Sequence, residues 1–538
     1  MNNIPCRICL EEIEETDVSK YNFIKYIGKG SYGDVEEYLT NDGKIRVIKK
    51  YKARNFNYTD MVREISSLSV VKGHPDFISM LGVNISSNTS ILILEKAIGS
   101  LKQFRNILSP KDIKNVMYRL IRGIRDLNKV GIYHRDIKPD NILIMEDGST
   151  LIADLGLAKG GPFEALGMSS PVYTIWYRAP EVILKDLGLN ESYGQEAEVW
   201  AIGMLFWDLL TANNKQAYYL LKTDVLDGSD RGLDQLYKVT NALNRENNTD
   251  SGWSQRVIKE LKKMKKTSAW SGKKDIAFEN YIGSFFDETT PQEGLDLVAK
   301  MLAIDPRMRI DLDSALEHDY FSDITDIPPV PSDLLMFNIN DFPELPDCSL
   351  FNKSDSLSDD PRTIWTKLSE EIYEMSKPNI LNFFLASHIS RCLFARKKID
   401  IKNFQLNAYA CLLLVETYNS DISSFTKYMT KTEILENRMK EIFLIVGLNL
   451  HLPTSWQILT DKYNLEEQTA VIVNILILLE CLFPENKVSF NVDLSVSMYN
   501  DPENNKEWIE KIMLASKYLT SKGLLKTVSI LEDLWLSK

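Results

Sequence analysis

The spacing of apolar side chains divides the chain into regions of different secondary structure. Up to about residue 321, short strand-like runs alternate with helical segments, whereas from residue 364 onward almost every segment has a helical period, with few glycines and no clear hairpin. Residues 322–361, between these regions, hold six prolines and follow neither period. The pattern predicts an α+β region, an extended tether and an all-α region.

A turn signal locates the first strands of a sheet. Asn41-Asp42-Gly43 separates two strand-like runs, residues 34–39 and 44–50. A glycine-rich segment, Gly28-Lys29-Gly30-Ser31-Tyr32-Gly33, precedes the first run. A dinucleotide-binding fold requires a helix after such glycines, so a hairpin at this point favours a flexible loop that covers nucleotide phosphates, with Val35 packed on the base.

The strand after this turn carries Lys49, whose ammonium group would reach those phosphates if it is not simply a solvated strand lysine. A helix is predicted from Thr59, a good cap residue, to Gly73. Glu64 lies within this helix. It pairs with Lys49 if the helix docks on the sheet, and otherwise it is a solvated carboxylate.

A second polar cluster surrounds a predicted hairpin. Residues 134–141 read HRDIKPDN, and the strand-like runs 142–145 and 150–153 flank Asp147-Gly148 and are followed by Asp154. If Asp147-Gly148 is a two-residue turn, Asn141 faces Asp154 across the base of the hairpin. An amide oxygen and a carboxylate at the end of a loop are ligands that Mg²⁺ prefers.

Two further residues of this cluster have side chains suited to group transfer. Asp136 lies five residues before Asn141, in position to accept the proton of an attacking hydroxyl group. Lys138 would neutralise charge that develops on a transferred phosphoryl group. The alternative interpretation is a polar turn with incidental carboxylates.

These motifs resemble those of the eukaryotic-type protein kinases over about residues 21–321, and Asp154-Leu155-Gly156, Ala179-Pro180-Glu181 and Arg309 extend the resemblance. It implies a bilobal α+β kinase fold, with an N-lobe at about 21–97 and a C-lobe at about 98–321. It also implies ATP and Mg²⁺ as cofactors and a structural role for Glu181 and Arg309. The residues that it assigns to ATP are Gly28, Gly30, Ser31, Tyr32, Gly33, Val35, Lys49, Glu64, Glu95 and Ala97.

Within that family, the cyclin-dependent kinases are the most similar branch. Residues 59–65 resemble their PSTAIRE helix, residues 173–181 resemble their substrate-binding segment, and Asp234-Gln235-Leu236 recurs in their C-lobe. This resemblance implies that Thr174 braces Asp136 and Lys138. It further implies a serine/threonine kinase that favours a proline directly after the target residue.

The resemblance also implies regulatory phosphorylation. Ser169 occupies the activation-segment phosphosite, where Arg63 and Arg135 would bind the phosphate, and Tyr32 matches the inhibitory tyrosine of the glycine loop. The alternative is that both residues stay unmodified. Lys159 stands where the family usually has a third arginine in this pocket.

Two positions depart from the family pattern. Leu155 replaces the usual Phe, a change that this branch tolerates. Glu198 replaces an Asp that accepts hydrogen bonds from the backbone of the catalytic loop. The additional methylene group predicts a displaced loop and modest activity, because a misplacement of about 1 Å can cost on the order of 10² in rate.

In the all-α region, residues 407–415 are apolar on nearly every face, which predicts a central helix with residues 380–394 and 433–446 as amphipathic neighbours. This order resembles a cyclin box over about residues 362–455, followed by a helical region at 456–538. Arg362 matches the buried arginine of cyclins, but Ser390 stands in place of its acidic partner. Thr417 and Met439 replace the kinase-contacting Lys and Glu of cyclins. The alternative is another kind of helical module.

Composition adds limits to this interpretation. The chain has 538 residues, 44% of them hydrophobic, which excludes disorder throughout. Residues 322–361 hold nine acidic side chains and one lysine, so the tether carries −8 of the net charge of −12. The remaining regions are nearly balanced in charge, and the argument against a nucleic-acid binder therefore depends more on the kinase motifs than on the net charge.

Weaker signals concern location and metal binding. Six scattered cysteines do not form a disulfide framework, and neither a secretory signal nor a membrane-spanning segment is evident, so we expect an intracellular protein of the cytoplasm, the nucleus or both. Cys6 and Cys9, in the extension formed by residues 1–20, lack further zinc ligands nearby. Residues 262–266 are a basic run that fits a solvated helix face better than a nuclear-import patch.

Taken together, these features predict a cyclin-dependent type of serine/threonine kinase that is fused to a cyclin-like domain and regulated by it in cis. Fusions of this kind resemble those encoded by large DNA viruses. One rival hypothesis is a nucleotide-binding scaffold, or pseudokinase, that regulates another kinase. A second rival is that the helical region recruits a separate host kinase.

Overall fold

The computed structural model describes most of two regions of the chain. The first is 16–331, without 20, 30–32, 53–58, 86–88, 161–173, 187–192, 224–230, 244–289 and 326. The second is 361–529, without 377–379, 396–403, 420–432, 446–449, 451–474, 478, 480, 482–487, 501–504, 517–518, 520–523 and 527. Among these residues, no helix is long and apolar enough to cross a membrane.

An antiparallel sheet of five strands forms the first lobe, in the order β1-β2-β3-β5-β4. The strands are β1 (Asn22–Lys29), β2 (Gly33–Leu39), β3 (Ile45–Lys52), β4 (Met80–Asn84) and β5 (Thr89–Leu94). The turn predicted at residues 41–43 is present, with Gly43 at a φ of 78° between β2 and β3. Gly33 begins β2 so close to β3 that a Cβ atom would lie 2.1 Å from the carbonyl oxygen of Lys50, and only glycine fits there.

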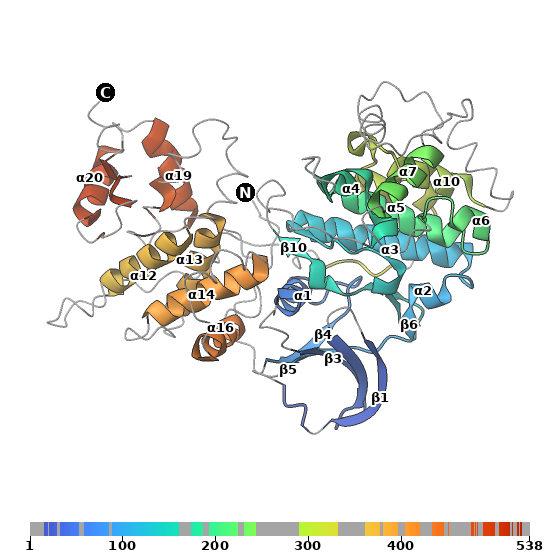
Figure 1. Cartoon of the computed structure of the whole chain (residues 1–538), viewed down its shortest axis with the longest axis horizontal. Helices are drawn as coiled ribbons and strands as arrows, with labels where there is room; N and C mark the ends of the chain where they lie inside the picture. Colours follow the sequence, from blue (N-terminus) through green and yellow to red (C-terminus); the bar gives the residue numbers. More distant parts are fainter. Residues whose placement is uncertain are drawn as a thin grey trace.

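The predicted helix after the hairpin is α1 (Thr59–Val70). It lies beside the sheet, and on its other side it contacts helix α14 (Phe404–Asn419) of the all-α region (Figure 1). Every residue of α1 except Asp60 is buried, including Ser66, Ser67 and Ser69. A helix that covers only one face of a sheet leaves a polar stripe in water. Burial all round therefore shows that α1 is packed between two bodies.

The second lobe is mainly helical and is organised around α3 (Pro110–Lys129) and α5 (Glu196–Leu210). Helix α3 begins with a capping box between Ser109 and Asp112 and with Pro110 at its first position. The other α-helices among the described residues of this lobe are α2 (Leu101–Phe104), α4 (Pro180–Asp186), α6 (Lys215–Tyr218), α7 (Arg231–Leu243), α10 (Gln292–Met301) and α11 (Leu312–Leu316). Short strands at the junction with the sheet are β6 (Gly99–Ser100), β7 (Ile132–Tyr133), β8 (Ile142–Ile144), β9 (Thr150–Ile152) and β10 (Lys159–Gly160).

The hairpin of β8 and β9 differs from the sequence prediction by one residue. Ile142 pairs with Ile152 and Ile144 with Thr150, and the turn is closed by Met145 and Ser149 around three residues instead of two. Gly148 adopts a φ of 82° in this turn, as the left-handed position of a three-residue loop requires. Asn141 therefore faces Ala153, whose N–H donates to its carbonyl oxygen at 2.9 Å, and Asp154 lies one residue beyond.

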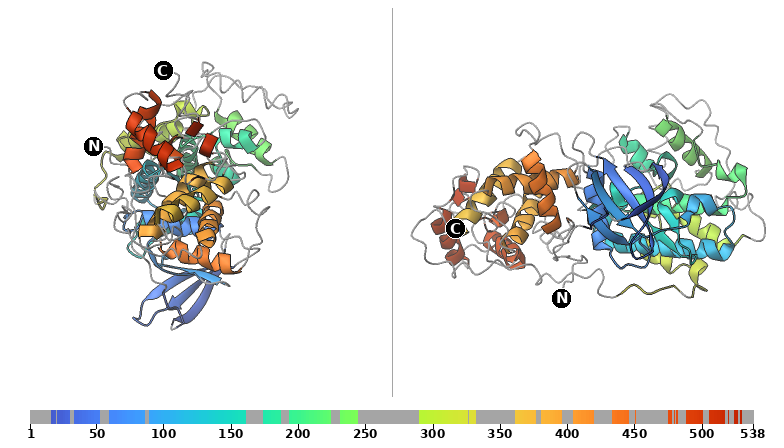
Figure 2. Two further views of the ribbon diagram at one scale, coloured as in Figure 1. Left: turned by 90° about the vertical axis from the view of Figure 1, so that its left-hand side faces the viewer. Right: turned by 90° about the horizontal axis from the view of Figure 1, so that it is seen from below.

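The all-α region contains the three helices that the apolar pattern predicted and several others. Helix α14 (Phe404–Asn419) is central and packs against α12 (Pro361–Ser376), α13 (Ile380–Ala395) and α16 (Glu433–Ile445). Helices α19 (Val488–Asn500) and α20 (Lys506–Ala515) lie farther from the first lobe (Figures 1 and 2). A single apolar cluster runs from the lobes into this region.

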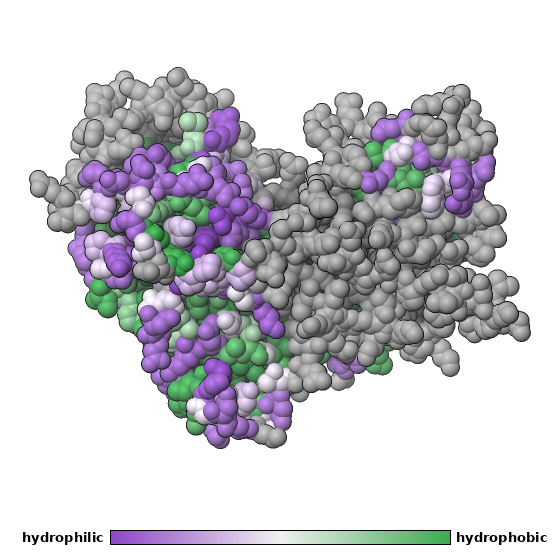
Figure 3. Space-filling view, turned by 180° about the vertical axis from the view of Figure 1, so that it is seen from behind, coloured by the Kyte–Doolittle hydropathy of each residue, from purple (hydrophilic) through white to green (hydrophobic). Residues whose placement is uncertain are grey.

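The surface of the sheet lobe differs from that of the helical lobe. Phe23, Ile24, Tyr26 and Ile27 of the edge strand β1 are exposed. Seen from behind, hydrophobic patches lie among hydrophilic residues at the lower end of the molecule, where this sheet lies (Figure 3). The edge strand β1 therefore exposes apolar side chains just before Gly28 in the sequence.

A buried ion pair joins the end of the second lobe to α4. Arg309 donates to Glu181 through both terminal nitrogens, at 2.5 and 2.8 Å, and also to the backbone carbonyl oxygens of Glu196 at 2.9 Å and Ala303 at 2.8 Å. Neither side chain of the pair is more than 2% exposed. The pairing that the resemblance implied is thus present, and it fixes three segments of the lobe together.

We predict that Arg309→Met lowers the free energy of unfolding by about 3 to 5 kcal/mol, because the substitution leaves the Glu181 carboxylate buried without its partner. Urea denaturation of the purified full chain measures the change. Arg307→Met is the matched control, since Arg307 pairs with Asp305 at 2.7 Å but is 70% exposed, and it should have little effect. Equal losses in both variants would contradict the proposed importance of the buried pair.

Candidate active site

Three charged side chains meet between the sheet, α1 and the loop after β9. The Nζ of Lys49, on β3, lies 2.5 Å from Glu64 of α1 and 2.9 Å from Asp154. Val35 is the direct partner of Lys49 on β2, so both belong to the same part of the sheet. The hydroxyl group of Tyr51 also donates to Glu64. Helix α1 therefore docks on the sheet, and Glu64 pairs with Lys49 instead of being a solvated carboxylate.

The electrostatics of this cluster depend on burial and on charge pairing. Burial by itself disfavours the Lys49 ammonium group, but the charges of Asp154 and Glu64 outweigh that effect and hold the pKa of Lys49 well above its ordinary value. Burial likewise opposes ionisation of Asp154, and the charge of Lys49 nevertheless lowers its pKa. Lys49 and Asp154 are therefore ionised at neutral pH.

The catalytic-loop residues form a second hydrogen-bonded group. Lys138 lies 2.5 Å from Oδ2 of Asp136, and the hydroxyl group of Thr174 lies 3.4 Å from Oδ1. The amide nitrogen of Asn141 donates to the backbone carbonyl oxygen of Asp136 at 2.8 Å and to Oδ2 at 3.1 Å. Asp136 is thus held by three neighbours in one orientation, as an acid–base group must be.

Asn141 and Asp154 fit the magnesium ion that the sequence implies. Because the nitrogen of Asn141 is used as a donor, its Oδ1 is left as an acceptor, and Asp154 contributes a carboxylate from a residue at a φ of 60°. No group of three or more His, Cys, Asp or Glu side chains is arranged for a metal in the described part of the chain. Two protein oxygens suit Mg²⁺, which keeps phosphate oxygens and water as its other ligands.

Glu198 supports the backbone of the catalytic loop despite its additional methylene group. Its Oε1 accepts from the backbone N–H of Arg135 at 2.8 Å. In the amide orientation that satisfies both of its polar atoms, Asn128 donates to Oε2 of Glu198 at 2.8 Å. Arg135 adopts a φ of 66°, a strained value for a residue with a side chain. The carboxylate therefore helps to hold an unfavourable backbone conformation next to Asp136.

The cationic residues expected to bind a phosphate are buried near one another in the fold. Arg63 and Arg135 are 3% and 2% exposed, and Lys159 is 3% exposed. The Nε of Arg63 donates to the backbone carbonyl oxygen of Tyr418, at 2.7 Å. Two nitrogens of Arg135 have no hydrogen-bond partner among the described residues. Ser169 lies outside the described residues, so its phosphorylation stays a prediction.

The remaining predicted nucleotide residues are only partly described. Gly30, Ser31 and Tyr32 lie outside the described residues. Glu95 follows β5, and its side chain accepts from the backbone N–H of Ser79 at 2.7 Å. Ala97, in the same connection between the lobes, is half-buried. Contacts of Glu95 and Ala97 with a nucleotide therefore stay predictions.

Sequence reasoning missed three residues next to this site, namely Asn128, Tyr418 and Leu450. Asn128 supports Glu198 from the last turn of α3. The backbone N–H of Leu450 donates to the Ser66 hydroxyl group of α1 at 2.7 Å. The available signal for Tyr418 was its place directly after Thr417, a position to which the resemblance to a cyclin box assigns contact with a kinase.

We predict a pH-dependent contribution of Glu198 to stability. Burial raises the pKa of Glu198 to about 7 from the ordinary 4.5, so its contribution is fully present below the ordinary pKa and is lost as the pH rises through about 7. Unfolding midpoints of the wild type should therefore fall between pH 5 and 8 more steeply than those of Glu198→Gln. Glu196→Gln, at the half-buried first residue of the same helix, should behave as the wild type does. Parallel curves for the wild type and Glu198→Gln would contradict the prediction.

Comparison with known proteins agrees with this geometry. Residues 21–321 match the family model of the protein kinase domain. Cyclin-dependent kinase 7 of Dictyostelium discoideum is 31% identical to the chain over 328 residues, which cover 57% of this chain and 80% of that protein. The matched region contains the Lys49, Glu64 and Asp154 cluster and the loop of Asp136 and Asn141. The chain belongs to the protein kinase family.

Proposed function

We propose that the chain transfers the γ-phosphate of ATP to serine or threonine residues of proteins, as a kinase of the cyclin-dependent type. The observation that carries this proposal is the assembled contact of Lys49 with both Glu64 and Asp154. In kinases this arrangement is required for phosphoryl transfer. The similarity to a cyclin-dependent kinase over most of that protein supports the finer assignment.

The residues of the site have separate tasks in this reaction. ATP with Mg²⁺ supplies the phosphoryl group and the charge that neutralises its oxygens. Lys49 orients the phosphates, and Asn141 and Asp154 would hold the metal. Asp136 accepts the proton of the substrate hydroxyl group, while Lys138, 2.5 Å away, balances the negative charge. Thr174 keeps Asp136 in place for that transfer.

We predict that Asp136→Asn lowers the rate of phosphate transfer by about 10² to 10⁴, because the amide cannot accept the proton. Transfer from [γ-³²P]ATP to a Ser-Pro peptide measures the rate, and a Ser-Ala peptide tests the preference for proline. Nucleotide affinity, which Asp136 does not set, is the control and should stay unchanged. A wild-type protein that binds ATP but transfers no phosphate under any activation condition would favour the scaffold hypothesis instead.

We further propose that the all-α region is cyclin-like and regulates the kinase in cis. Helix α14 lies against α1, Arg63 donates to Tyr418, and Leu450 donates to Ser66. These contacts keep α1 against the sheet, which keeps Glu64 within reach of Lys49. Thr417 and Met439 contact each other inside the helical region, with the Thr417 hydroxyl group 3.9 Å from the Met439 sulfur. The docking contacts are made instead by Tyr418 and Leu450.

The connection between the two parts favours this docking. Arg122 of α3 donates to the carbonyl oxygen of Pro328 at 2.7 Å, and Lys114 pairs with Asp323 at 2.5 Å. The start of the tether is thus bound to the second lobe. The composition of residues 322–361 predicts a tether of about 40 residues, for which the r.m.s. reach is roughly 35 Å. Tethers of this kind give effective concentrations in the millimolar range. A weak interface would be saturated under those conditions.

We predict that cutting the tether makes activity depend on concentration. A protease site placed within residues 332–360 leaves both parts intact, and the cut protein should lose activity on dilution while the uncut protein does not. Kinase assays over a range of protein concentrations, with gel filtration to confirm separation, measure the effect. Full activity in separated parts would contradict regulation in cis and would favour a helical region that recruits a separate kinase.

Location and regulation complete the proposal. A reaction that consumes ATP and modifies proteins is expected inside a cell, in the cytoplasm or the nucleus. Ser169 and Tyr32 are the proposed regulatory phosphosites, with Arg63 and Arg135 as partners of the first. The resemblance to viral kinase–cyclin fusions depends only on domain order and on the abundance of Asn, Ile and Lys.

A further inference from the structure

Tyr418 connects the helical region to two different parts of the kinase. It lies at the end of α14 and is only 3% exposed. Its backbone carbonyl oxygen accepts from Nε of Arg63 on α1 at 2.7 Å, and its hydroxyl group accepts from the backbone N–H of Gly160 on β10 at 2.8 Å. One residue therefore contacts both the helix that carries Glu64 and the start of the segment that follows the metal site.

The second contact reaches the elements that position the catalytic residues. Gly160 pairs with Ile132 and Lys159 with Tyr133 on β7, and His134 directly follows that strand. Gly160 also lies six residues after Asp154, beyond the turn that contains Leu155. The position of the Gly160 N–H thus depends on the catalytic loop, through the pairing of β10 with β7, and on Asp154, through the turn that connects Asp154 to β10.

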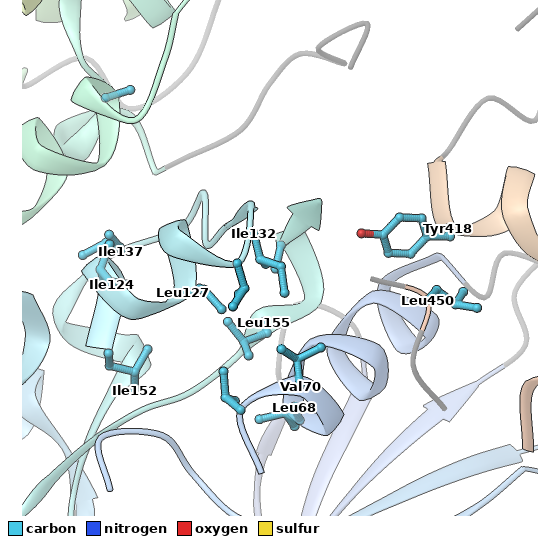
Figure 4. Close-up of a cluster of buried hydrophobic side chains, with 14 of the residues drawn as sticks. Leu68, Val70, Ile124, Leu127, Ile132, Ile137, Ile152, Leu155, Tyr418 and Leu450 are labelled. Carbon is cyan, nitrogen blue, oxygen red and sulfur yellow. The ribbon is translucent and has the colours of Figure 1, made fainter. Parts of the chain in front are cut away.

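The surroundings of the Tyr418 ring show why its hydroxyl group matters. The ring belongs to the apolar cluster that includes Leu127, Ile132, Leu155 and Val70. Figure 4 shows it entering from the helical region, with its hydroxyl oxygen directed toward the kinase residues around Ile132. A phenylalanine would supply the same apolar contact. The additional oxygen gives the half-buried Gly160 N–H an acceptor within the protein, at 2.8 Å.

We propose that Tyr418 is a positioning residue whose hydroxyl group couples docking of the helical region to the placement of the activation segment. The inference deepens the proposed regulation in cis and rests on it. When the helical region is undocked, water satisfies the Gly160 N–H. When it is docked, the Tyr418 hydroxyl group accepts from the Gly160 N–H while its carbonyl oxygen accepts from Arg63 of α1, so β10 is held at Gly160 whenever α1 is covered. Docking of the helical region thus fixes both α1, which carries Glu64, and β10, which begins the segment after Asp154.

The test is Tyr418→Phe in the full chain. The substitution keeps the backbone carbonyl that Arg63 uses, so α1 should stay docked, but it removes the oxygen that accepts from the Gly160 N–H. We expect kcat for a Ser-Pro peptide to fall about tenfold or more, with little change in KM for ATP. Amide hydrogen exchange should accelerate in peptides that contain residues 155–160 and stay slow in peptides from residues 59–70.

Tyr409→Phe is the matched control. It removes a hydroxyl group from the same helix, and at 100° per residue its position nine residues earlier lies on the opposite side of α14. It should retain the kcat and the exchange pattern of the wild type. A general loss of stability in α14 would affect both variants, and equal losses of kcat would overturn the proposal.

Other outcomes separate this inference from the proposed function. If Tyr418→Phe retains the wild-type kcat and exchange while cutting the tether still abolishes activity on dilution, regulation in cis stands and the role of the hydroxyl group is overturned. If exchange at residues 155–160 accelerates but kcat does not change, the coupling to catalysis is overturned. If cutting the tether has no effect on activity, the proposed regulation in cis itself fails.

Discussion

The buried contact between Lys49 and Glu64 is the interaction on which the active arrangement depends. Removing a lysine and a glutamate from water costs several kcal/mol for each ion, and only a close pairing offsets that cost. The two residues belong to different elements, a strand of the sheet and helix α1. The pair therefore exists only while α1 stays against the sheet. Whatever holds α1 there also determines whether Lys49 is positioned for phosphate.

This constraint explains the composition of α1 and of its surroundings. Ser66, Ser67 and Ser69 are buried in this helix, where buried polar groups need hydrogen-bond partners. Ser69 donates to the carbonyl oxygen of Ile65 in its own helix, at 2.9 Å. Ser66 receives a hydrogen bond from Leu450. The helical region thus satisfies polar groups on α1 in addition to covering apolar ones, which makes its docking specific in orientation.

Much of this arrangement could be predicted from the sequence, and the exceptions have physical reasons. Turn chemistry and strand patterning located the first hairpin and α1, because these depend on local signals. The Lys49–Glu64 pair could be predicted only on the condition that α1 docks on the sheet. The β8–β9 register was wrong by one residue, because Asp147-Gly148 fits a two-residue turn as well as the end of a three-residue loop. Glu198 was expected to displace the loop, but its longer side chain still reaches the Arg135 N–H. Contacts such as those of Tyr418 and Asn128 depend on how distant elements meet, and no local pattern encodes that.

The anchored tether has a consequence for the response of this chain to its own abundance. When a kinase and its covering partner are separate molecules, the amount of complex depends on the product of two concentrations. In a chain where Arg122 binds the start of the tether at Pro328 and α14 lies on α1, the two parts are always present in a ratio of one to one. Kinase activity would then rise in direct proportion to the number of chains, with no threshold set by the concentration of a separate partner.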